Sequence, residues 1–376
     1  MIPFNKPFVT GKEYDYIREA VQSGKISGDG IFTQKCQDFF EKRYGFGKCL
    51  LTTSCTDALE MAAILIDIQP GDEVIMPTYT FVSTANAFVL RGAKIIFADS
   101  YGTHPNMDAD AIEPLVTPRT KAIVVVHYAG VACDMDKIIG IARKHKLFVI
   151  EDAAQAIDSF YIDKKKNEKP LGSIGDLAAF SFHETKNIIS GEGGMLAINN
   201  EDFFERAEII REKGTNRSAF FRGEVNKYGW VDIGSSFLPS EIIAAFLWAQ
   251  LENLDLIQAK RHQLWSCYQE NLGPVAVKQS VELPFIPEYA TNNSHMFYLV
   301  FKNLAERTSF IQRCKENGIM TVFHYLSLHK SPYYESKYCG KELVNADRFS
   351  DTLVRLPFFF ELTEPDIIKI AGMLDR

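Results

Sequence analysis

The sequence predicts an α/β fold with a mostly parallel seven-stranded sheet and helices on both faces. Seven short apolar runs are the first observation: residues 49–52, 73–76, 94–98, 122–127, 147–151, 177–182 and 195–198. Helical stretches of about ten residues separate most of these runs, and this alternation is typical of parallel sheets. Hydrophobicity is continuous over residues 122–126, which indicates a strand covered on both faces.

The helices of this region follow from amphipathic spacing. We expect a helix at residues 12–23, in the middle of an N-terminal leader of residues 1–30 that ends in a glycine-rich segment. We expect a second helix at residues 33–44, where two phenylalanines lie among charged and amide side chains. Between the strands we expect helices at residues 57–66, 84–91, 108–116 and 135–145. Such helices cover the two faces of a parallel sheet.

The regular alternation of short strands and helices ends in the second half of the chain. Residues 161–170 are a hydrophilic break, residues 201–213 a helix, residues 214–234 an irregular loop and residues 240–270 a long helical run. The last part predicts strands at 295–301 and 320–325 and helices at 305–317 and 365–374. We therefore predict a large cofactor-binding domain over residues 1–250. A connecting helix at 251–275 and a small α+β domain complete residues 251–376.

Composition excludes several classes of protein. The net charge is −7 and no block of Lys or Arg compensates it, so general nucleic-acid binding has no electrostatic basis. The seven cysteines are scattered without a CxxC pair, which predicts a protein of the reducing cytoplasm. We find no secretory signal, membrane span, metal-ligand spacing, GxGxxG or Walker motif.

Ligands of open α/β sheets bind beyond the carboxyl ends of the strands. Ser54, Cys55 and Thr56 follow the first strand and begin a helix, so their hydroxyl and N–H groups predict a small anion site. The alternative is an ordinary helix cap, because Ser54 and Asp57 have capping-box spacing.

Two further positions suit a flat cofactor ring. Asp152 follows a buried strand, where a carboxylate requires a cationic partner such as a protonated pyridine nitrogen, and Gln155 lies three residues on. The alternative for Asp152 is a helix cap. Phe81 or Tyr79 is an aromatic side chain at a strand end and can stack on a ring, although core packing is the commoner use.

The last pair is Ser181 and Lys186, which lie between two apolar runs. A lysine acts as a nucleophile only when it is deprotonated, so burial or nearby positive charge must lower its pKa. The alternative is a lysine in a solvated loop. A phosphate cradle, an aromatic lid, a carboxylate for a ring nitrogen, a serine and an amine together suit pyridoxal 5'-phosphate.

Several motifs resemble the DegT/StrS-type sugar-nucleotide aminotransferases, which are fold-type I pyridoxal phosphate enzymes. They are Ser-Phe-His-Glu-Thr-Lys-Asn with Gly-Glu-Gly-Gly, Glu-Asp-Ala-Ala-Gln, Gly-Asp-Glu-Val-Ile-Met-Pro and Val-His-Tyr-Ala-Gly. The resemblance covers nearly the whole chain. Phe-His-Glu-Thr-Lys-Asn and Arg-Glu-Lys-Gly-Thr-Asn-Arg-Ser are most similar to the members that form dTDP-4-amino-4,6-dideoxygalactose.

The resemblance implies a role for each matching residue near the ring. Lys186 binds the cofactor covalently and later moves a proton between the substrate and the cofactor. Asp152 pairs with the ring nitrogen, Gln155 lies near the ring hydroxyl and Phe81 stacks on the ring.

The resemblance also implies contacts at the two ends of the site. Thr56, Cys55 and Ser181 hold the phosphate. His324 and His329 match a family segment near the sugar, and the alternative for both is a structural histidine.

One segment departs from the pattern of the family and one is unusually basic. Many relatives carry an Asn that reaches the phosphate of the neighbouring subunit, whereas Ser236 occupies that place here. The densest cationic stretch runs over residues 211–222, and Arg217 is our candidate contact for a nucleotide diphosphate; the alternative is a solvated loop.

The activity implied by the resemblance is amino transfer from L-glutamate to a dTDP-4-keto-6-deoxyhexose, in a homodimer with shared active sites. A dehydratase of the same family is one alternative, and Lys186 argues against it because members with that activity carry His there. Amination at C3 and a non-catalytic regulator on the same fold are the others.

Overall fold

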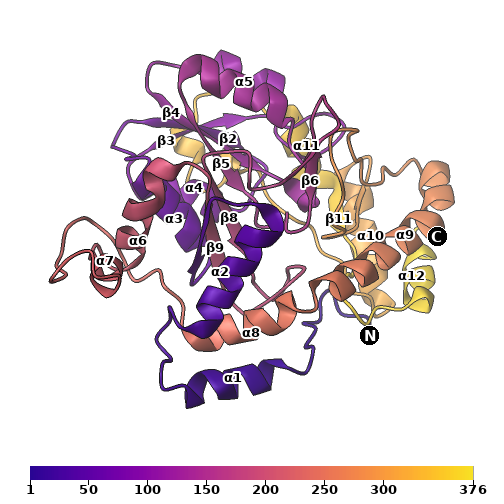
Figure 1. Ribbon diagram of the computed structural model, residues 1–376. Helices are drawn as coiled ribbons and strands as arrows, with labels where there is room; N and C mark the ends of the chain where they lie inside the picture. The colour runs from indigo at the N-terminus through magenta and orange to yellow at the C-terminus, as the bar shows by residue number, and fades with distance from the viewer. Residues whose placement is uncertain (376) are drawn as a thin grey trace.

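The computed structural model describes residues 1–375 and places the seven predicted runs in one sheet (Figure 1). The strand order is β1-β9-β8-β5-β4-β2-β3. The strands are β1 Lys48–Thr52, β2 Glu73–Pro77, β3 Lys94–Ala98, β4 Thr120–Val126, β5 Phe148–Asp152, β8 Leu177–Ser181 and β9 Gly194–Ile198. Only β9 runs antiparallel to its two neighbours. The predicted mostly parallel seven-stranded sheet is therefore confirmed.

Helices cover both faces of the sheet. They are α1 Glu13–Gln22, α2 Ile31–Tyr44, α3 Cys55–Leu65, α4 Val82–Val89, α5 Met135–His145, α6 Phe204–Arg211 and α8 Glu241–Leu251. One hydrophobic cluster joins α2, α5 and α8 to one face, and a second joins α3, α4 and α6 to the other. Along β4, Ile123 and Val125 belong to the first cluster and Ala122 and Val124 to the second, which explains the continuous hydrophobicity of this strand.

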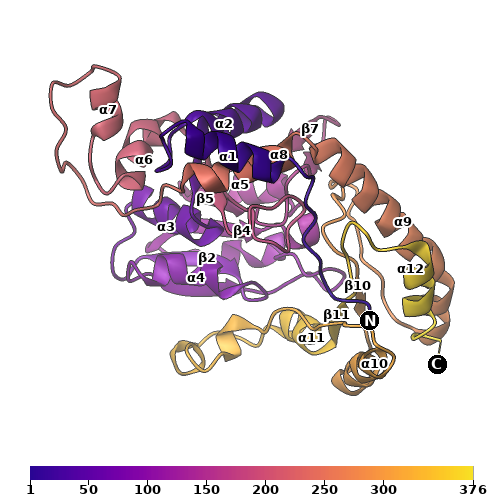
Figure 2. The ribbon, with the colours of Figure 1, turned by 90° about the horizontal axis from the view of Figure 1, so that it is seen from below.

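The C-terminal part has a third cluster. Its elements are α9 Leu254–Gln279, β10 Tyr298–Val300, α10 Leu304–Glu316, α11 Val344–Thr352, β11 Leu353–Arg355 and α12 Glu364–Ala371. Ile2 belongs to the same cluster, and its N–H donates to the carbonyl of Gly318 at 2.8 Å. The N-terminus of the chain thus packs against the C-terminal part (Figure 2). The proposed domain boundary at residue 250 stays a prediction.

Three predicted elements differ in the structure. Residues 108–116 form two short 3₁₀ helices, Ala109–Ala111 and Glu113–Leu115, because Pro114 lacks the N–H that a continuous helix needs. Residues 320–325 make no ladder and contribute only an isolated bridge between Val322 and Arg355. The run at 240–270 divides into α8 and α9, and α9 continues past Pro274.

Two segments without a predicted element also have structure. The hydrophilic break is a hairpin of β6 Phe160–Ile162 and β7 Glu168–Pro170. The loop at 214–234 contains α7 Arg217–Phe221 and projects from the body as an arm in both views (Figures 1 and 2). Among residues 1–375, no helix is long and apolar enough to cross a bilayer.

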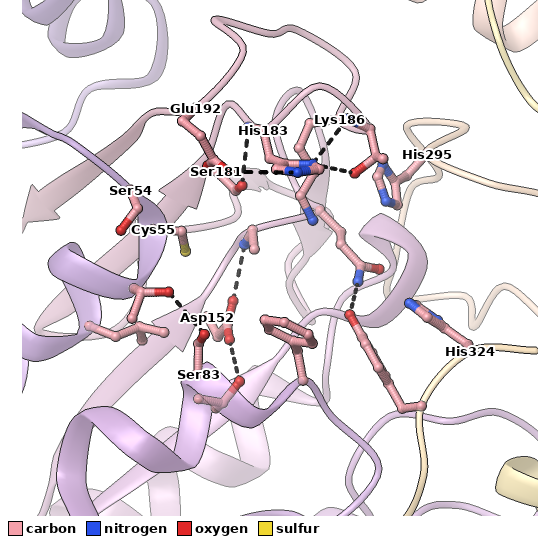
Figure 3. Close-up of a pocket in the computed structure, with 18 of the residues that line it drawn as sticks. Ser54, Cys55, Ser83, Asp152, Ser181, His183, Lys186, Glu192, His295 and His324 are labelled. Carbon is pink, nitrogen blue, oxygen red and sulfur yellow. Dashed lines mark hydrogen bonds and ion pairs between the residues drawn. The ribbon is translucent and has the colours of Figure 1, made fainter. Parts of the chain in front are cut away.

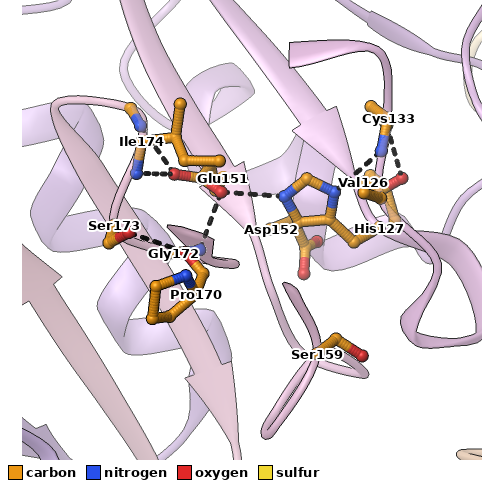
Figure 4. A network of polar contacts seen from close by, with 12 residues as sticks. Val126, His127, Cys133, Glu151, Asp152, Ser159, Pro170, Gly172, Ser173 and Ile174 are labelled. Carbon is orange, nitrogen blue, oxygen red and sulfur yellow. Dashed lines mark hydrogen bonds and ion pairs between the residues drawn. The ribbon is translucent and has the colours of Figure 1, made fainter. Parts of the chain in front are cut away.

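A fully buried carboxylate, Glu151, joins β5 to the loop before β8 (Figure 4). Its oxygens accept the N–H groups of Gly172, Ile174 and Gly175 at 2.7, 2.8 and 2.6 Å. They also accept a hydrogen bond from His127 Nε2 at 2.9 Å. A buried carboxylate is costly to desolvate, and these four donors offset that cost.

The tautomer of His127 follows from its second contact. Its Nδ1 accepts the N–H of Cys133 at 3.2 Å, so the hydrogen lies on Nε2 and is donated to Glu151. Side chains alternate along a strand, so the next residue, Asp152, points to the opposite face of the sheet. The Glu151 network therefore anchors the strand end that carries Asp152.

We expect Glu151→Gln to lower the free energy of unfolding at pH 7 by roughly 1–3 kcal/mol, because an amide cannot accept all of these bonds. Burial alone favours the neutral acid, but the bonds from His127, Gly175 and Gly172 outweigh it and hold the pKa of Glu151 below 4.5. The stabilisation is complete above the ordinary pKa of 4.5 and is lost as the pH falls from there through the lowered pKa.

Urea unfolding from pH 7 downward measures this effect. The difference between wild type and Glu151→Gln should shrink below pH 4.5. The control is Glu270→Gln, which should behave as wild type, because Glu270 is exposed and has no side-chain hydrogen bond or ion pair within residues 1–375. Equal stability of Glu151→Gln and wild type at pH 7 would contradict the anchoring role.

Candidate active site

A cavity of about 490 Å³ lies beyond the carboxyl ends of β1, β2, β5 and β8 (Figure 3). The residues predicted to bind the cofactor all line it: Cys55, Thr56, Phe81, Asp152, Gln155, Ser181 and Lys186. Two of them end strands, two begin α3 and three lie in loops after strands, so the order of strands in the sheet brings them together.

Lys186 and Asp152 face this cavity without forming an ion pair with each other. Burial lowers the pKa of Lys186; the charges of Cys55 and Asp152 oppose this shift, and that of Arg355 adds to it. A lower pKa increases the fraction of unprotonated amine, which is the nucleophilic form. The amine and the carboxylate thus lie more than 4.0 Å apart on the wall of one cavity.

The carboxylate of Asp152 is held by hydroxyl and backbone donors. Its Oδ2 accepts the hydroxyl of Thr84 at 2.6 Å, and its Oδ1 accepts the N–H of Ala154 at 3.2 Å. Burial raises the pKa of Asp152, while Thr84, Ala154 and Lys186 oppose the shift. Within residues 1–375 Asp152 has no ion-pair partner, so a protonated ring nitrogen suits it well.

The place for a flat ring is bounded by Phe81 and Gln155. Phe81 lines the cavity and is 56% exposed, which leaves an aromatic face available for stacking. The other candidate, Tyr79, is buried in the core. Gln155 accepts the N–H of Ala129 at 2.7 Å and donates to Tyr325 Oη at 2.9 Å, so its amide has a fixed orientation.

The opposite end of the cavity is an anion cradle. Ser54 caps α3 by accepting the N–H of Asp57 at 3.1 Å, so the capping interpretation also holds. The N–H groups of Cys55 and Thr56 have no acceptor in residues 1–375. Free N–H groups at a helix N-terminus bind phosphate, and their dipoles favour negative charge.

Gly194 allows the cradle to form beside β9. A Cβ at this position would lie 2.3 Å from the carbonyl carbon of Ser54 and 2.4 Å from the nitrogen of Cys55. Both atoms belong to the backbone, so no side-chain rotation relieves the clash. An amine, an unpaired carboxylate, an aromatic face and an anion cradle thus fit pyridoxal phosphate.

The predicted substrate contacts divide into one inside the cavity and two outside it. His324 lines the cavity, accepts or donates a hydrogen bond with Tyr128 Oη at 2.7 Å, and stacks on Tyr325 with ring centroids 3.6 Å apart. His329 is buried elsewhere, where its Nδ1 bonds with Thr78 Oγ1 at 2.9 Å. Its other nitrogen lies 3.7 Å from a carboxylate oxygen of Asp347. For His329 the geometry supports the structural alternative.

Arg217 lies on α7, away from the cavity of its own chain. Its guanidinium is 3.8 Å from Glu212 and lies over the ring of Phe221. Ser236 is exposed at the base of the same arm and pairs with Glu212 in an isolated bridge. Neither residue completes the cavity within a single chain.

Several cavity residues have no role in the sequence-based prediction, among them Thr84, His295, Tyr325 and Arg355. Thr84 follows Phe81 by three residues at the start of α4, a helical spacing that was available as a signal. The other three come from the C-terminal part and reach the cavity only through tertiary packing. Among residues 1–375, no group of three or more His, Cys, Asp or Glu side chains is arranged to hold a metal ion.

Comparison with known proteins agrees with this geometry. A family model described as the DegT/DnrJ/EryC1/StrS aminotransferase family matches residues 8–375. The chain is 33% identical over 377 residues to the GDP-perosamine synthase of Caulobacter vibrioides, covering 98% of this chain and 96% of that protein. It is 32% identical over 375 residues to the spore coat polysaccharide biosynthesis protein SpsC of Bacillus subtilis, covering 97% and 94%.

A solved structure has the same fold over the whole chain. The aminotransferase TlmJ of Streptoalloteichus hindustanus superposes with a TM-score of 0.90 at 26% identity, covering 100% of this chain and 98% of that chain.

Gly194→Ala tests the cradle. We expect the added methyl group to push the start of α3 away from β9, which should weaken pyridoxal phosphate binding by roughly tenfold and lower stability by roughly 1–3 kcal/mol. Absorbance titration with the cofactor and thermal unfolding measure the two effects. Gly140→Ala is the control, because that glycine lies in α5 with nothing within 4 Å of its added Cβ. Unchanged cofactor affinity in Gly194→Ala would contradict the proposed cradle.

Proposed function

The chain belongs to the DegT/DnrJ/EryC1/StrS aminotransferase family and is a pyridoxal phosphate-dependent sugar aminotransferase, and we propose a specific reaction for it. L-Glutamate donates its amino group to C4 of a dTDP-4-keto-6-deoxyhexose, giving dTDP-4-amino-4,6-dideoxygalactose and 2-oxoglutarate for cell-surface glycan synthesis. The observation that carries this proposal is a buried amine, Lys186, facing the same cavity as the unpaired carboxylate of Asp152.

The names of the relatives support the class of substrate. One relative is a GDP-perosamine synthase, and another is named for the biosynthesis of a spore coat polysaccharide. We place the reaction in the cytoplasm, where the seven unpaired cysteines stay reduced.

Each residue at the ring end of the cavity has a distinct task. When bound, pyridoxal phosphate supplies an aldehyde that exchanges amines and a protonated ring that withdraws electrons from the reacting carbon. Asp152 would keep a proton on the ring nitrogen, and Phe81 would stack on the ring. Gln155 would lie near the ring hydroxyl, and its Nε2 has a second hydrogen besides the one donated to Tyr325.

The cradle and the lysine complete the arrangement. The backbone of Cys55 and Thr56 and the hydroxyls of Thr56 and Ser181 hold the phosphate. Lys186 would hold the aldehyde carbon of the cofactor, and its Nζ would move a proton to or from the reacting carbon of the substrate. Burial lowers the pKa of this amine and so increases its unprotonated, nucleophilic fraction.

Turnover of dTDP-4-keto-6-deoxyglucose with L-glutamate tests the reaction. The expected product carries an axial amine at C4, which NMR of the sugar ring reads directly. An equatorial amine, amination at C3 or a deoxy product would contradict the reaction proposed here and favour another member of the family. A GDP-linked 4-keto-6-deoxyhexose is the comparison substrate for the choice of nucleotide.

Lys186→Ala is the matched variant for the same assay. Loss of the acid–base group should lower turnover by roughly 100- to 10,000-fold or more. Borohydride reduction, which attaches the cofactor permanently to a lysine amine in wild type, should leave no covalently attached cofactor in the variant. Thermal unfolding verifies that the variant folds. Turnover equal to wild type would exclude Lys186 as the catalytic amine and favour a different chemistry on this fold.

We further propose a homodimer in which the arm at 214–234 reaches the partner. The arm projects from the body (Figure 2). Three of its aromatic side chains are exposed, namely Phe221, Tyr228 and Trp230, the last to 84%. Exposed aromatic side chains gathered on one projection are typical of an interface. Arg217 lies on this arm and Ser236 at its base, so their proposed contacts with diphosphate and phosphate require the cavity of the partner.

Trp230→Ser should raise the dissociation constant of the dimer by roughly 10- to 100-fold, because interface tryptophans contribute strongly to binding. Sedimentation velocity over a range of protein concentrations measures the shift. Val277→Ser is the control, because this side chain is 82% exposed near the end of α9, on the opposite side of the molecule from α7 (Figure 1). A dimer unaffected by Trp230→Ser would contradict the role of the arm.

A further inference from the structure

The residue that follows Lys186 is Asn187, a buried asparagine whose amide is fully engaged. Its Nδ2 donates to Oε1 of Gln258 on α9 at 2.9 Å and to the carbonyl of Asn293 at 3.0 Å. Its Oδ1 pairs with Nδ1 of His295 at 2.8 Å. Both amide hydrogens are therefore used, and the oxygen is held as well. These bonds tie the segment that carries Lys186 to α9 and to the segment just before β10.

The hydrogen of the His295 ring lies on Nδ1 and is donated to Asn187. A backbone carbonyl only accepts, so the amide nitrogen of Asn187 must face Asn293, and its oxygen must face His295. An amide oxygen also only accepts, so Nδ1 is the donor. Burial lowers the pKa of His295, and the charge of Lys186 adds to this shift. The ring is therefore neutral, and its single hydrogen is committed to Asn187.

Asn293 extends these bonds to the loop that follows β5. Its side chain is fully buried, and its Nδ2 donates to the carbonyls of Gln155 and Ile157 at 2.8 and 2.7 Å. Its Oδ1 accepts the N–H of His295 at 3.1 Å. Gly130 leaves room for this side chain, since a Cβ there would lie 1.9 Å from Oδ1 of Asn293. The lysine segment and the loop of Gln155 thus share one buried network.

We propose that this network, formed by Asn187, Asn293 and His295, positions the amine of Lys186 for attachment to the cofactor. The inference rests on the proposed role of Lys186 and adds the residues that act through it. Attachment forms a carbon–nitrogen double bond between Nζ and the aldehyde carbon, and the two amine hydrogens leave with the aldehyde oxygen as water. The lysine stem is flexible, so the backbone position of Lys186 decides what its amine can reach. A misplacement of about 1 Å can slow such a step by roughly 100-fold.

His295 also lines the cavity, so a direct contact with a ligand is the alternative (Figure 3). The ring nitrogen left for such a contact is Nε2, which carries no hydrogen and can therefore accept but not donate. Two substitutions separate the two roles. His295→Asn keeps a donor near the place of Nδ1 and removes Nε2, whereas His295→Leu removes both.

Asn106 provides a matched control. It is also buried, its Nδ2 donates to the carbonyls of Val131 and Ala132, both at 2.9 Å, and its Oδ1 accepts the N–H of Tyr128 at 2.9 Å. It does not line the cavity, and within residues 1–375 none of its hydrogen bonds reaches the lysine segment. Asn106→Ala should therefore lose thermal stability as Asn187→Ala does, but attach and bind the cofactor as wild type does.

Two measurements on the full-length, cofactor-free protein separate attachment from binding. Stopped-flow absorbance gives the limiting rate of attachment at saturating pyridoxal 5'-phosphate. Calorimetry gives the affinity for pyridoxine 5'-phosphate, whose alcohol replaces the aldehyde and cannot attach. We expect Asn187→Ala and His295→Leu to slow attachment by roughly 10- to 100-fold, with unchanged affinity for the alcohol analogue. His295→Asn should attach the cofactor nearly as fast as wild type.

Three results would overturn the inference. One is attachment at the wild-type rate in Asn187→Ala, or in His295→Leu if the first variant does not fold. A second is slow attachment with an equal loss of analogue affinity, which would show a general structural effect. A third is equally slow attachment in both His295 variants, which would assign His295 to direct contact through Nε2. If borohydride reduction of wild type traps no cofactor on Lys186, the proposed function itself fails, whereas a different sugar product leaves the role of the network intact.

Discussion

The burial of opposite charges in one cavity, without an ion pair between Lys186 and Asp152, is the constraint on which the rest of the site depends. A direct ion pair would satisfy both groups and occupy the space that a cofactor needs. Because the two groups are separated, neither one neutralises the charge of the other. Burial lowers the pKa of the Lys186 amine and raises that of the Asp152 carboxyl, and the carboxylate lacks a cationic partner. The cavity is therefore complementary to a ring that carries an aldehyde and a protonated nitrogen.

The sheet places the two groups on different elements. Asp152 ends the central strand β5, while Lys186 lies in the loop that connects β8 to β9. On the far side of β5, the buried Glu151 network fixes the same strand end. Alternation along the strand thus gives adjacent carboxylates different tasks, one structural and one directed at the ligand.

The C-terminal part supplies the other wall of the cavity. His324, Tyr325 and Arg355 reach the site from segments of the C-terminal part. An imidazole, a phenol and a guanidinium thus join the cavity residues that the sheet and its loops supply.

The sequence by itself determined the seven strands, most of the helices and the set of residues from Cys55 to Lys186 that line the cavity. Those features depend on local periodicity and on the rule that polar groups at strand ends meet at one edge of a sheet. Tertiary structure decided the rest: Arg355 entered the cavity, whereas His329 and Arg217 lay outside it, and residues 320–325 made no ladder. The reason is physical, because those positions depend on contacts between segments far apart in the chain, and local patterns carry no information about such contacts.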